Sequence, residues 1–410
     1  MSAFKKLWII AYRDLGRNRR RSGLTILAVA LGLTLLIMMS GYIAGIFDSS
    51  INDSIRLNSG NIQIRSEGYE IEKLSLKWED LLDNSDKLLK QVTDTKGVAA
   101  VAPVLWAGGF MTTVDETVGI RVTGIDPDSK FHDPIRESII AGEYLAVDDR
   151  DGIMIGKHLA DCLGIGVGSK INLLVGTSDG KTDEDIFNVV GLFSTGVLNY
   201  DESTVYMTLS KAQAITGVGD RISAVIVLTE ENEATDSTAA ILRSPNYKLE
   251  TWEEMNAIIL EAIQTGMSFY IIMYGIVILV VAVIITNTLL MSVFERTREL
   301  GILAALGMKG RQLMTMILLE ASALAILGII LGIVIGSIGV LYLSVAGIPI
   351  GDAVAGVAQG FAIRSVLYTK FVPDQIMGLS IATLVIVLLG SLYPASFAAR
   401  LEPVDALHAL

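Results

Sequence analysis

The chain has 410 residues, of which 51% are hydrophobic, and its mean hydropathy of +0.54 is well above that of an ordinary soluble domain. Its formal net charge of −12 argues against a nucleic-acid partner, because short basic clusters occur only beside hydrophobic runs. Cys162 is the single cysteine, which excludes an intramolecular disulfide and a cysteine-rich metal site. The composition therefore favours a membrane protein.

Four apolar stretches are long enough to cross the roughly 30 Å hydrocarbon layer as helices. They comprise residues 23–47, 267–293, 313–345 and 376–398. None contains lysine or arginine, and Glu320 is the only charged residue inside them. The first stretch follows a basic segment, as in a signal peptide, but it exceeds the apolar region of about 7–15 residues found there. No small-residue cleavage site follows it, so we predict an uncleaved anchor.

The basic residues predict the orientation of these spans. Residues 1–22 carry seven basic residues against the single acid Asp14, and the loop 294–312 carries four. Since lysine and arginine are enriched in short cytoplasmic loops, we expect both segments and the tail 399–410 in the cytoplasm. The segment 48–266 and the short loop 346–375 then lie outside. The 18 basic and 36 acidic residues of 48–266 are compatible with this topology, that of a multi-pass bacterial inner-membrane protein with both termini cytoplasmic.

The cytoplasmic segment 1–22 contains an amphipathic stretch. Within Ala3–Leu15 one helical face is apolar and consists of Phe4, Leu7, Trp8, Ala11 and Leu15. Such a helix lies in the membrane interface, so we predict an anchoring role; direct contact with a soluble partner is the alternative.

The segment 48–266 is long enough for a folded domain or two subdomains, and its pattern is α+β. Alternating apolar residues predict strands at 61–65, 98–104, 118–124, 169–175, 185–193, 204–208 and 223–228. Helical spacing predicts helices at 78–92, 156–163, 210–216 and 233–242. A helix from Trp252 is predicted to continue unbroken into the second span as a rigid stalk. The predicted fold is a four-helix membrane protein with a large α+β extracytoplasmic domain between helices 1 and 2.

No catalytic, cofactor-binding or metal site is predicted. His132, His158 and His408 are scattered, and neither an H-E-x-x-H nor a G-x-S-x-G motif occurs. Residues 168–170 read GSK, the wrong order for the phosphate-binding loop G-x-x-x-x-G-K-[ST]. We therefore expect no enzymatic activity in this chain.

Several segments resemble one known family. Residues 287–307 read NTLLMSVFERTRELGILAALG, and shorter matches are RNRRRSGLT at 17–25, Glu320 with the glycines that follow it, Pro394-Ala395, and RLEPVDAL at 400–407. Over nearly its whole length the chain resembles the ABC transporter permeases of the MacB, FtsX and lipoprotein-releasing (LolC/LolE) group. Within the inserted domain, GLFSTGVLNYD at 191–201 and TVYM at 204–207 look more like the lipoprotein-releasing permeases than like the macrolide exporter.

The resemblance implies that ATP is hydrolysed on a separate ABC ATPase, which would bind the ATP and magnesium, while this chain binds no cofactor. It also identifies the loop 294–312 as the segment that couples to an ATPase dimer. The residues expected to pair with a groove of the ATPase, fill its floor or end the coupling helix are Glu295, Arg296, Arg298, Glu299, Leu303, Leu306 and Gly307. The alternative is that these are interfacial anchors whose arginines set the topology.

Two further sets of residues lie within the spans. A charge-poor cargo groove between helices 1 and 2 is expected from Leu33, Leu36, Ile37, Met38, Ile272, Tyr274 and Ile278, for which ordinary lipid contact is the alternative. Small residues at four-residue spacing allow close helix packing, within one chain or in a dimer; they are Gly41, Gly45, Gly328, Gly332 and Gly336. Glu320 lies about 13 Å of helix beyond Arg311 and is expected to reach headgroups or a neighbouring helix.

The function implied by the resemblance is ATP-driven conformational change of the outer domain by a permease paired with a second copy or a paralogue. The favoured role is release of a lipoprotein or lipid from the inner membrane to a periplasmic acceptor. Two alternatives remain: an exporter of peptides or small amphiphiles with an adaptor and an outer-membrane duct, and a mechanotransmission regulator of a periplasmic enzyme.

Overall fold

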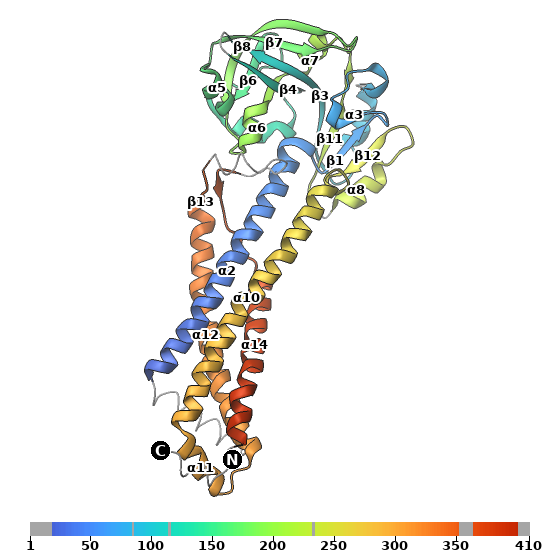
Figure 1. The fold of residues 1–410 in the computed structure, drawn as a ribbon. Coiled ribbons are helices and arrows are strands. Elements are labelled where there is room, and N and C mark those ends of the chain that lie inside the picture. Colours follow the sequence, from blue (N-terminus) through green and yellow to red (C-terminus); the bar gives the residue numbers. More distant parts are fainter. Residues whose placement is uncertain (1–18, 84–85, 114–115, 232–233, 352–363, 401–410) are drawn as a thin grey trace. The chain divides into compact units, whose positions relative to one another are not determined.

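The computed structural model describes residues 19–83, 86–113, 116–231, 234–351 and 364–400, so the predicted helix Ala3–Leu15 and the segment 401–410 lie outside the described residues. The described chain divides into two compact units (Figure 1). The helical unit takes its residues from Met1–Ile46, Ile263–Ile348 and Tyr368–Leu410, and the inserted unit from Phe47–Ala262 and Pro349–Leu367.

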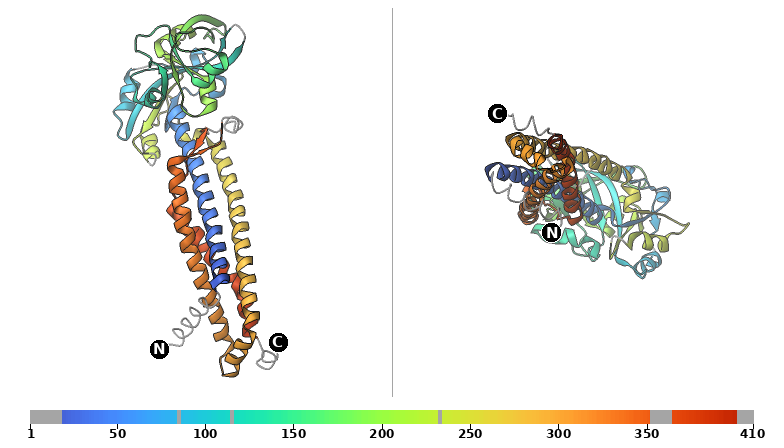
Figure 2. Two further views of the ribbon diagram at one scale, coloured as in Figure 1. Left: turned by 90° about the vertical axis from the view of Figure 1, so that its left-hand side faces the viewer. Right: turned by 90° about the horizontal axis from the view of Figure 1, so that it is seen from below.

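Among the described residues, the helical unit contains four long helices and one short one. They are α2 (Arg19–Ser54), α10 (Ala257–Glu295), α11 (Thr297–Ala305), α12 (Gly310–Ala346) and α14 (Pro373–Ala399). Each long helix contains one of the four predicted apolar stretches and is long and apolar enough to cross a membrane. In the helical unit α2, α10 and α12 run side by side (Figure 2).

Glycines set how closely α2 and α12 approach. A Cβ atom added to Gly328 would come within 2.6 Å of Val29, and one added to Gly332 within 2.9 Å of Leu33. Gly336 faces Ile37 in the same way, and the Thr34 hydroxyl donates to the Gly332 carbonyl at 3.3 Å. The predicted glycine stripe therefore packs two helices of one chain.

The glycines at the other end of α2 serve the same purpose. Gly41 lies against Val340 and the Lys370 carbonyl, and its own carbonyl accepts from the Lys370 amide at 2.9 Å. Gly45 lies against the backbone of Tyr368. The small-residue motifs of α2 and α12 thus both form contacts within the chain.

The inserted unit holds one ten-stranded mixed sheet. Its strands are β1 (Ile62–Arg65), β3 (Val98–Thr112), β4 (Thr117–Ile125), β5 (Ile139–Gly142), β6 (Gly152–Gly156), β7 (Lys170–Gly176), β8 (Thr182–Phe193), β9 (Thr204–Thr208), β11 (Ala224–Thr229) and β12 (Lys248–Thr251). The order is β12-β1-β11-β3-β4-β9-β6-β8-β5, and β7 pairs with both β3 and β8. Six strands, β3-β4-β9-β6-β8-β7, therefore close into a ring.

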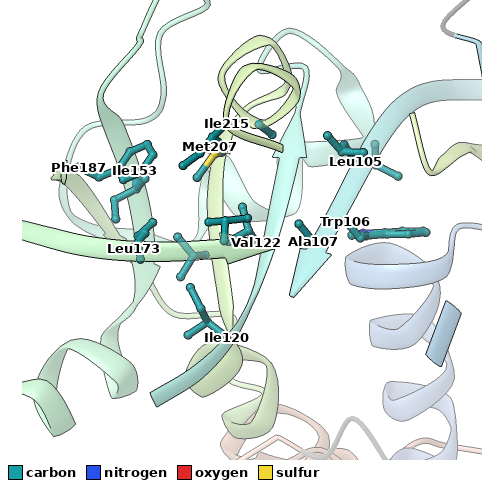
Figure 3. Close-up of a cluster of buried hydrophobic side chains, with 14 of the residues drawn as sticks. Leu105, Trp106, Ala107, Ile120, Val122, Ile153, Leu173, Phe187, Met207 and Ile215 are labelled. Carbon is teal, nitrogen blue, oxygen red and sulfur yellow. The ribbon is translucent and has the colours of Figure 1, made fainter. Parts of the chain in front are cut away.

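The closed ring surrounds the largest apolar core. Strand β7 alternates between buried and less buried residues, as does the second half of β8, so one face of each points inward. Figure 3 shows the buried side chains, which include Trp106, Val122, Ile153, Leu173 and Phe187. Helices α5 (Lys157–Leu163), α6 (Leu198–Ser203) and α7 (Leu209–Thr216) belong to this lobe.

Strand β3 joins the ring to a smaller open lobe. Its first half pairs with β11, which leads to β1 and β12, while its second half pairs with β7. Helices α3 (Asp86–Thr93) and α8 (Thr235–Leu242) contribute Val92, Ala239 and Leu242 to the core of this lobe. The remaining short elements are α4 (Asp133–Glu137), α9 (Trp252–Met255), the pair β2 (Leu82–Asp83) and β10 (Arg221–Ile222), and the pair β13 (Ile348–Pro349) and β14 (Val366–Leu367).

Two local predictions are wrong. The helix predicted at 78–92 is replaced by a 3₁₀ turn, the short strand β2 and then α3, because Leu82 pairs with Ile222 of β10. The stalk predicted to run unbroken from Trp252 is interrupted at Asn256 (φ −111°, ψ 29°), whose side-chain amide donates to the Trp252 carbonyl at 2.9 Å. Tertiary pairing and a local side-chain bond override helical spacing in these two places.

Candidate functional site

Helix α11 is a short, well-capped helix between two spans. Arg296 leaves the helical conformation (φ −113°, ψ 16°) between α10 and α11. At the other end the Gly307 amide donates to the Ala304 carbonyl at 3.0 Å and the Met308 amide to the Leu303 carbonyl at 3.1 Å. With Gly307 at φ 93°, this is a Schellman motif, which requires a glycine-compatible conformation. The sequence 296–309 therefore defines both ends of the helix.

One face of α11 packs against the spans on either side. Leu300 is buried with Val293, Leu313 and Met316, and Leu303 packs against the same cluster. The start of α12 touches the end of α14, because a Cβ atom on Gly310 would lie 2.6 Å from the Ala399 carbonyl oxygen. The short helix is thus seated on the ends of three long ones.

A buried ion pair lies at the junction between α10 and α11. The Arg296 guanidinium lies 3.5 Å from the Glu320 carboxylate of α12, and these side chains are only 10% and 8% exposed. Arg296 also pairs with Glu299 at 3.2 Å. A buried charge is tolerated where an opposite charge and hydrogen bonds compensate it, so Arg296 ties α11 to α12.

A second polar link joins the end of α10 to the start of α2. The Arg21 guanidinium donates to Glu295 at 2.6 Å and to the Ser292 hydroxyl at 2.7 Å. Glu295 and Ser292 lie 274 and 271 residues after Arg21 in the chain. Three spans therefore converge on the base of α11 through charged side chains.

The opposite face of α11 is exposed and mixed in character. Arg298 and Ala305 are exposed, Ile302 is 45% exposed and Leu306 is 79% exposed. Arg298, Ile302 and Leu306 follow one another at spacings of four residues, and Ala305 lies three residues after Ile302, so these side chains share one helical face. Two exposed aliphatic side chains beside an arginine form a small surface suited to a protein partner.

The predicted coupling residues thus separate into two groups. Arg298, Leu306 and the half-exposed Glu299 face outward, whereas Arg296 points into the protein and Leu303 is half-buried in the cluster. Prediction from sequence missed Ile302, Ala305 and the Arg21 link. The four-residue spacing from Arg298 to Ile302 and Leu306 was a signal for the outward face, but no sequence signal paired Arg21 with Glu295.

The predicted cargo-groove residues do not gather on one surface. Leu33 and Ile37 are buried against the glycines of α12, Leu36 and Ile278 are also buried, and Met38 and Tyr274 are half-buried. Only Ile272 is well exposed, at 62%. Within one chain, Leu33 and Ile37 serve helix packing, because glycines on α12 leave room for them.

Family models match both parts of the chain. The model of the MacB-like periplasmic core domain matches residues 22–244, and the model of the FtsX-like permease C-terminal region matches residues 271–403. The chain belongs to the MacB/FtsX/LolC family of ABC transporter permeases. Its inserted unit is the MacB-like domain, and its α11 segment lies within the FtsX-like region. Membership in this family implies an ATPase partner.

Similar proteins include permeases of three kinds. The permease is 23% identical, over 96% of both chains, to the lipoprotein-releasing system transmembrane protein LolC of Neisseria meningitidis. It is 30% identical to the uncharacterized ABC transporter permease YknZ of Bacillus subtilis, over 52% of this chain and 51% of the relative. The crystal structure of the periplasmic region of MacB from Actinobacillus actinomycetemcomitans covers 51% of this chain and 97% of its own, with 14% identity and a TM-score of 0.35.

Proposed function

We propose that this permease is driven by a separate ABC ATPase that docks on the exposed face of α11. The observation that carries the proposal is the division of α11 into an outward face, with Arg298, Ile302 and Leu306, and an inward face seated on the spans. Ile302 and Leu306 are 45% and 79% exposed and lie beside Arg298, and adjacent exposed apolar side chains with a polar rim are typical of a protein-binding surface. In this arrangement α11 lies in the cytoplasm and the inserted unit outside the cell.

A displacement of α11 would be passed directly to the membrane-spanning helices α10 and α12. The Arg296 pairs with Glu320 and Glu299, together with the apolar cluster around Leu300, prevent α11 from moving without α10 and α12. Helix α10 is 39 residues long, which corresponds to about 58 Å at 1.5 Å per residue. An uninterrupted helix of that length transmits displacement from the ATPase toward the inserted unit.

The proposed role is release of a lipoprotein or lipid from the inner membrane. Its support is the alignment with LolC of Neisseria meningitidis over 96% of both chains, together with alignment to LolE of Haemophilus influenzae over 93% of this chain and 92% of that protein. The working unit would be two permease chains, identical or paralogous, with two ATPase subunits.

Co-purification tests the docking surface. The full-length chain, solubilised in detergent, is co-expressed with ABC ATPases of its own organism, and the stoichiometry and ATPase activity of the complex are measured. Leu306→Asp and Arg298→Glu alter only the exposed face, so each should reduce ATPase retention by at least about tenfold, the effect of losing about 1.4 kcal/mol. Tyr342→Ser, a change at a 69% exposed site on α12, is the matched control and should leave retention unchanged.

The same preparation tests the cargo. Acylated proteins or lipids that remain bound and are released on ATP addition support the release role. An adaptor protein retained in their place would favour export, and a soluble hydrolase would favour regulation of a periplasmic enzyme. Absence of any ATPase from the wild-type complex would refute the docking proposal itself.

A further inference from the structure

A cavity of about 490 Å³ lies within the inserted unit. It opens to solvent and is lined by the end of α2 and the following π-helical turn, by α6, and by the start of α10. Its polar lining includes Arg121, Asn58, Asn199 and Asn256, and its apolar lining includes Leu57 and Ile259. Its volume is that of a site for a small molecule or a headgroup.

Arg121 is the residue that gives this cavity a charge preference. It projects from β4, is half-buried, and its guanidinium carbon lies 5.8 Å from the centre of the Tyr200 ring. Its Nε atom is buried without a hydrogen-bond partner, and in the part of the chain that the structure describes the guanidinium forms no ion pair. A guanidinium carries five N–H donors, and a buried donor such as this Nε is costly to leave without an acceptor, which a ligand could supply.

The carboxylate in the cavity does not neutralise Arg121. Asp53 accepts two hydrogen bonds from Arg364, at 2.7 Å from Nε and 2.5 Å from Nη2, so its charge is already paired in a bidentate manner. The Tyr200 hydroxyl donates to the Leu57 carbonyl at 2.7 Å, and burial raises the pKa of this phenol, which therefore stays neutral. Among the residues that the structure describes, Arg121 is therefore the one charge of the lining without an opposite charge paired to it.

The apolar part of the lining belongs to helices that continue into the spans. Leu57 follows Phe47, the end of the first apolar stretch, by ten residues, or about 15 Å at 1.5 Å per residue. Ile259 precedes Met267, the start of the second stretch, by eight residues, or about 12 Å. Both lengths exceed the thickness of the headgroup layer, which adds about 5–8 Å on each side of the hydrocarbon, so a lipid bound in the cavity would have left the bilayer surface.

We propose that this cavity binds the phosphodiester headgroup of an anionic phospholipid. Arg121 would pair with the phosphate, since a guanidinium matches phosphate oxygens in a forked geometry. The amides of Asn58 and Asn199 would bind the polar headgroup, and Leu57 and Ile259 would contact the start of the acyl chains. The choice of a lipid rests on the proposed release function, yet the binding requires no ATPase, so failure of one proposal is distinguishable from failure of the other.

The test measures binding to the detergent-solubilised full-length chain by isothermal titration calorimetry. The probes are dihexanoyl phosphatidylglycerol, inorganic phosphate and dihexanoylglycerol, which lacks the phosphate. Arg121→Gln should weaken phosphatidylglycerol binding by at least about tenfold, as expected for loss of a charge-assisted hydrogen bond. Arg121→Lys, which keeps the charge but not the fork, should weaken it less. Arg243→Gln, a 60% exposed arginine paired with Glu254 outside the cavity, is the matched control.

Each outcome bears on the proposal. Selective loss in Arg121→Gln, with Arg243→Gln unchanged, supports it. Inorganic phosphate binding as tightly as phosphatidylglycerol would overturn the lipid assignment and leave a site for free phosphate. Unchanged binding in Arg121→Gln, or equal binding of phosphatidylglycerol and dihexanoylglycerol by the wild type, would overturn the anion site. The second comparison remains decisive if Arg121→Gln does not fold.

Discussion

The buried pair between Arg296 and Glu320 leads to a quantitative prediction about stability and coupling. At 3.5 Å and an effective dielectric constant of about 20, two unit charges attract by about 5 kcal/mol. Removing one member of such a pair typically costs about 3–5 kcal/mol, because the other charge stays buried. We therefore expect Arg296→Met to lower the free energy of unfolding by about 3–5 kcal/mol.

The two single substitutions should differ. In Glu320→Gln, Arg296 keeps Glu299 at 3.2 Å, which is 48% exposed, so the loss should be smaller, about 1–3 kcal/mol. Replacing both residues with methionine removes both buried charges and fills a similar volume, so the double variant should recover most of the stability.

Denaturant titration in mixed micelles measures these differences, and the ATPase activity of the reconstituted complex measures coupling. The double variant should fold well, but its complex should show weaker coupling to the ATPase, since the ion pair between Arg296 and α12 is gone. A double variant whose loss equals the sum of the two single losses would refute the reasoning, as would a Glu320→Gln variant less stable than Arg296→Met.

Three further predictions concern other parts of the chain. Gly332→Val should lower the free energy of unfolding by about 1–3 kcal/mol, since even a Cβ atom there would come within 2.9 Å of Leu33. Burial lowers the pKa of His132 to about 3, and the nearby Arg136 adds to this effect. Between about pH 6.5 and pH 3 the unfolded histidine is protonated while the native one stays neutral. The free energy of unfolding should therefore fall by about 1.4 kcal/mol for each pH unit from about pH 6.5 toward pH 3. Cys162, which is exposed on the inserted unit, should react with a membrane-impermeant maleimide in intact spheroplasts.

Matched controls accompany these three measurements. Gly275→Val has no neighbour within 4 Å of the added Cβ atom and should cost much less than Gly332→Val; equal losses would contradict the packing argument. His132→Asn should remove the histidine part of the pH dependence between the two pKa values, and an unchanged slope would exclude it as the cause. Labelling of Cys162 only after the membrane is permeabilised would reverse the proposed orientation.

The packing of the helices shows what a one-dimensional pattern leaves open. The spacing of Gly328, Gly332 and Gly336 predicts that another helix packs closely against α12. A helix of the same chain and a helix of a second copy would both produce this glycine spacing in the sequence. The structure places Val29, Leu33 and Ile37 against these glycines, within the same chain.

In the inserted unit, seven of the strands could be located from alternation, because each has one face in a core. The closure of the ring through β7, which pairs with both β3 and β8, could not be predicted, because strand pairing joins residues that are distant in the sequence. The helix predicted at 78–92 failed for the same reason: Leu82 lies opposite Ile222, which is 140 residues away.

The sequence by itself determined the four spans, the α+β character of the inserted domain and the family, because hydrophobic length, local periodicity and contiguous motifs are properties of neighbouring residues. Only the tertiary structure decided that Arg296 faces Glu320, that Arg21 binds Glu295, and that Arg121 lines a cavity with no ion-pair partner among the described residues. Charges in a folded chain are compensated across space, and the distance between two side chains is independent of their separation along the sequence.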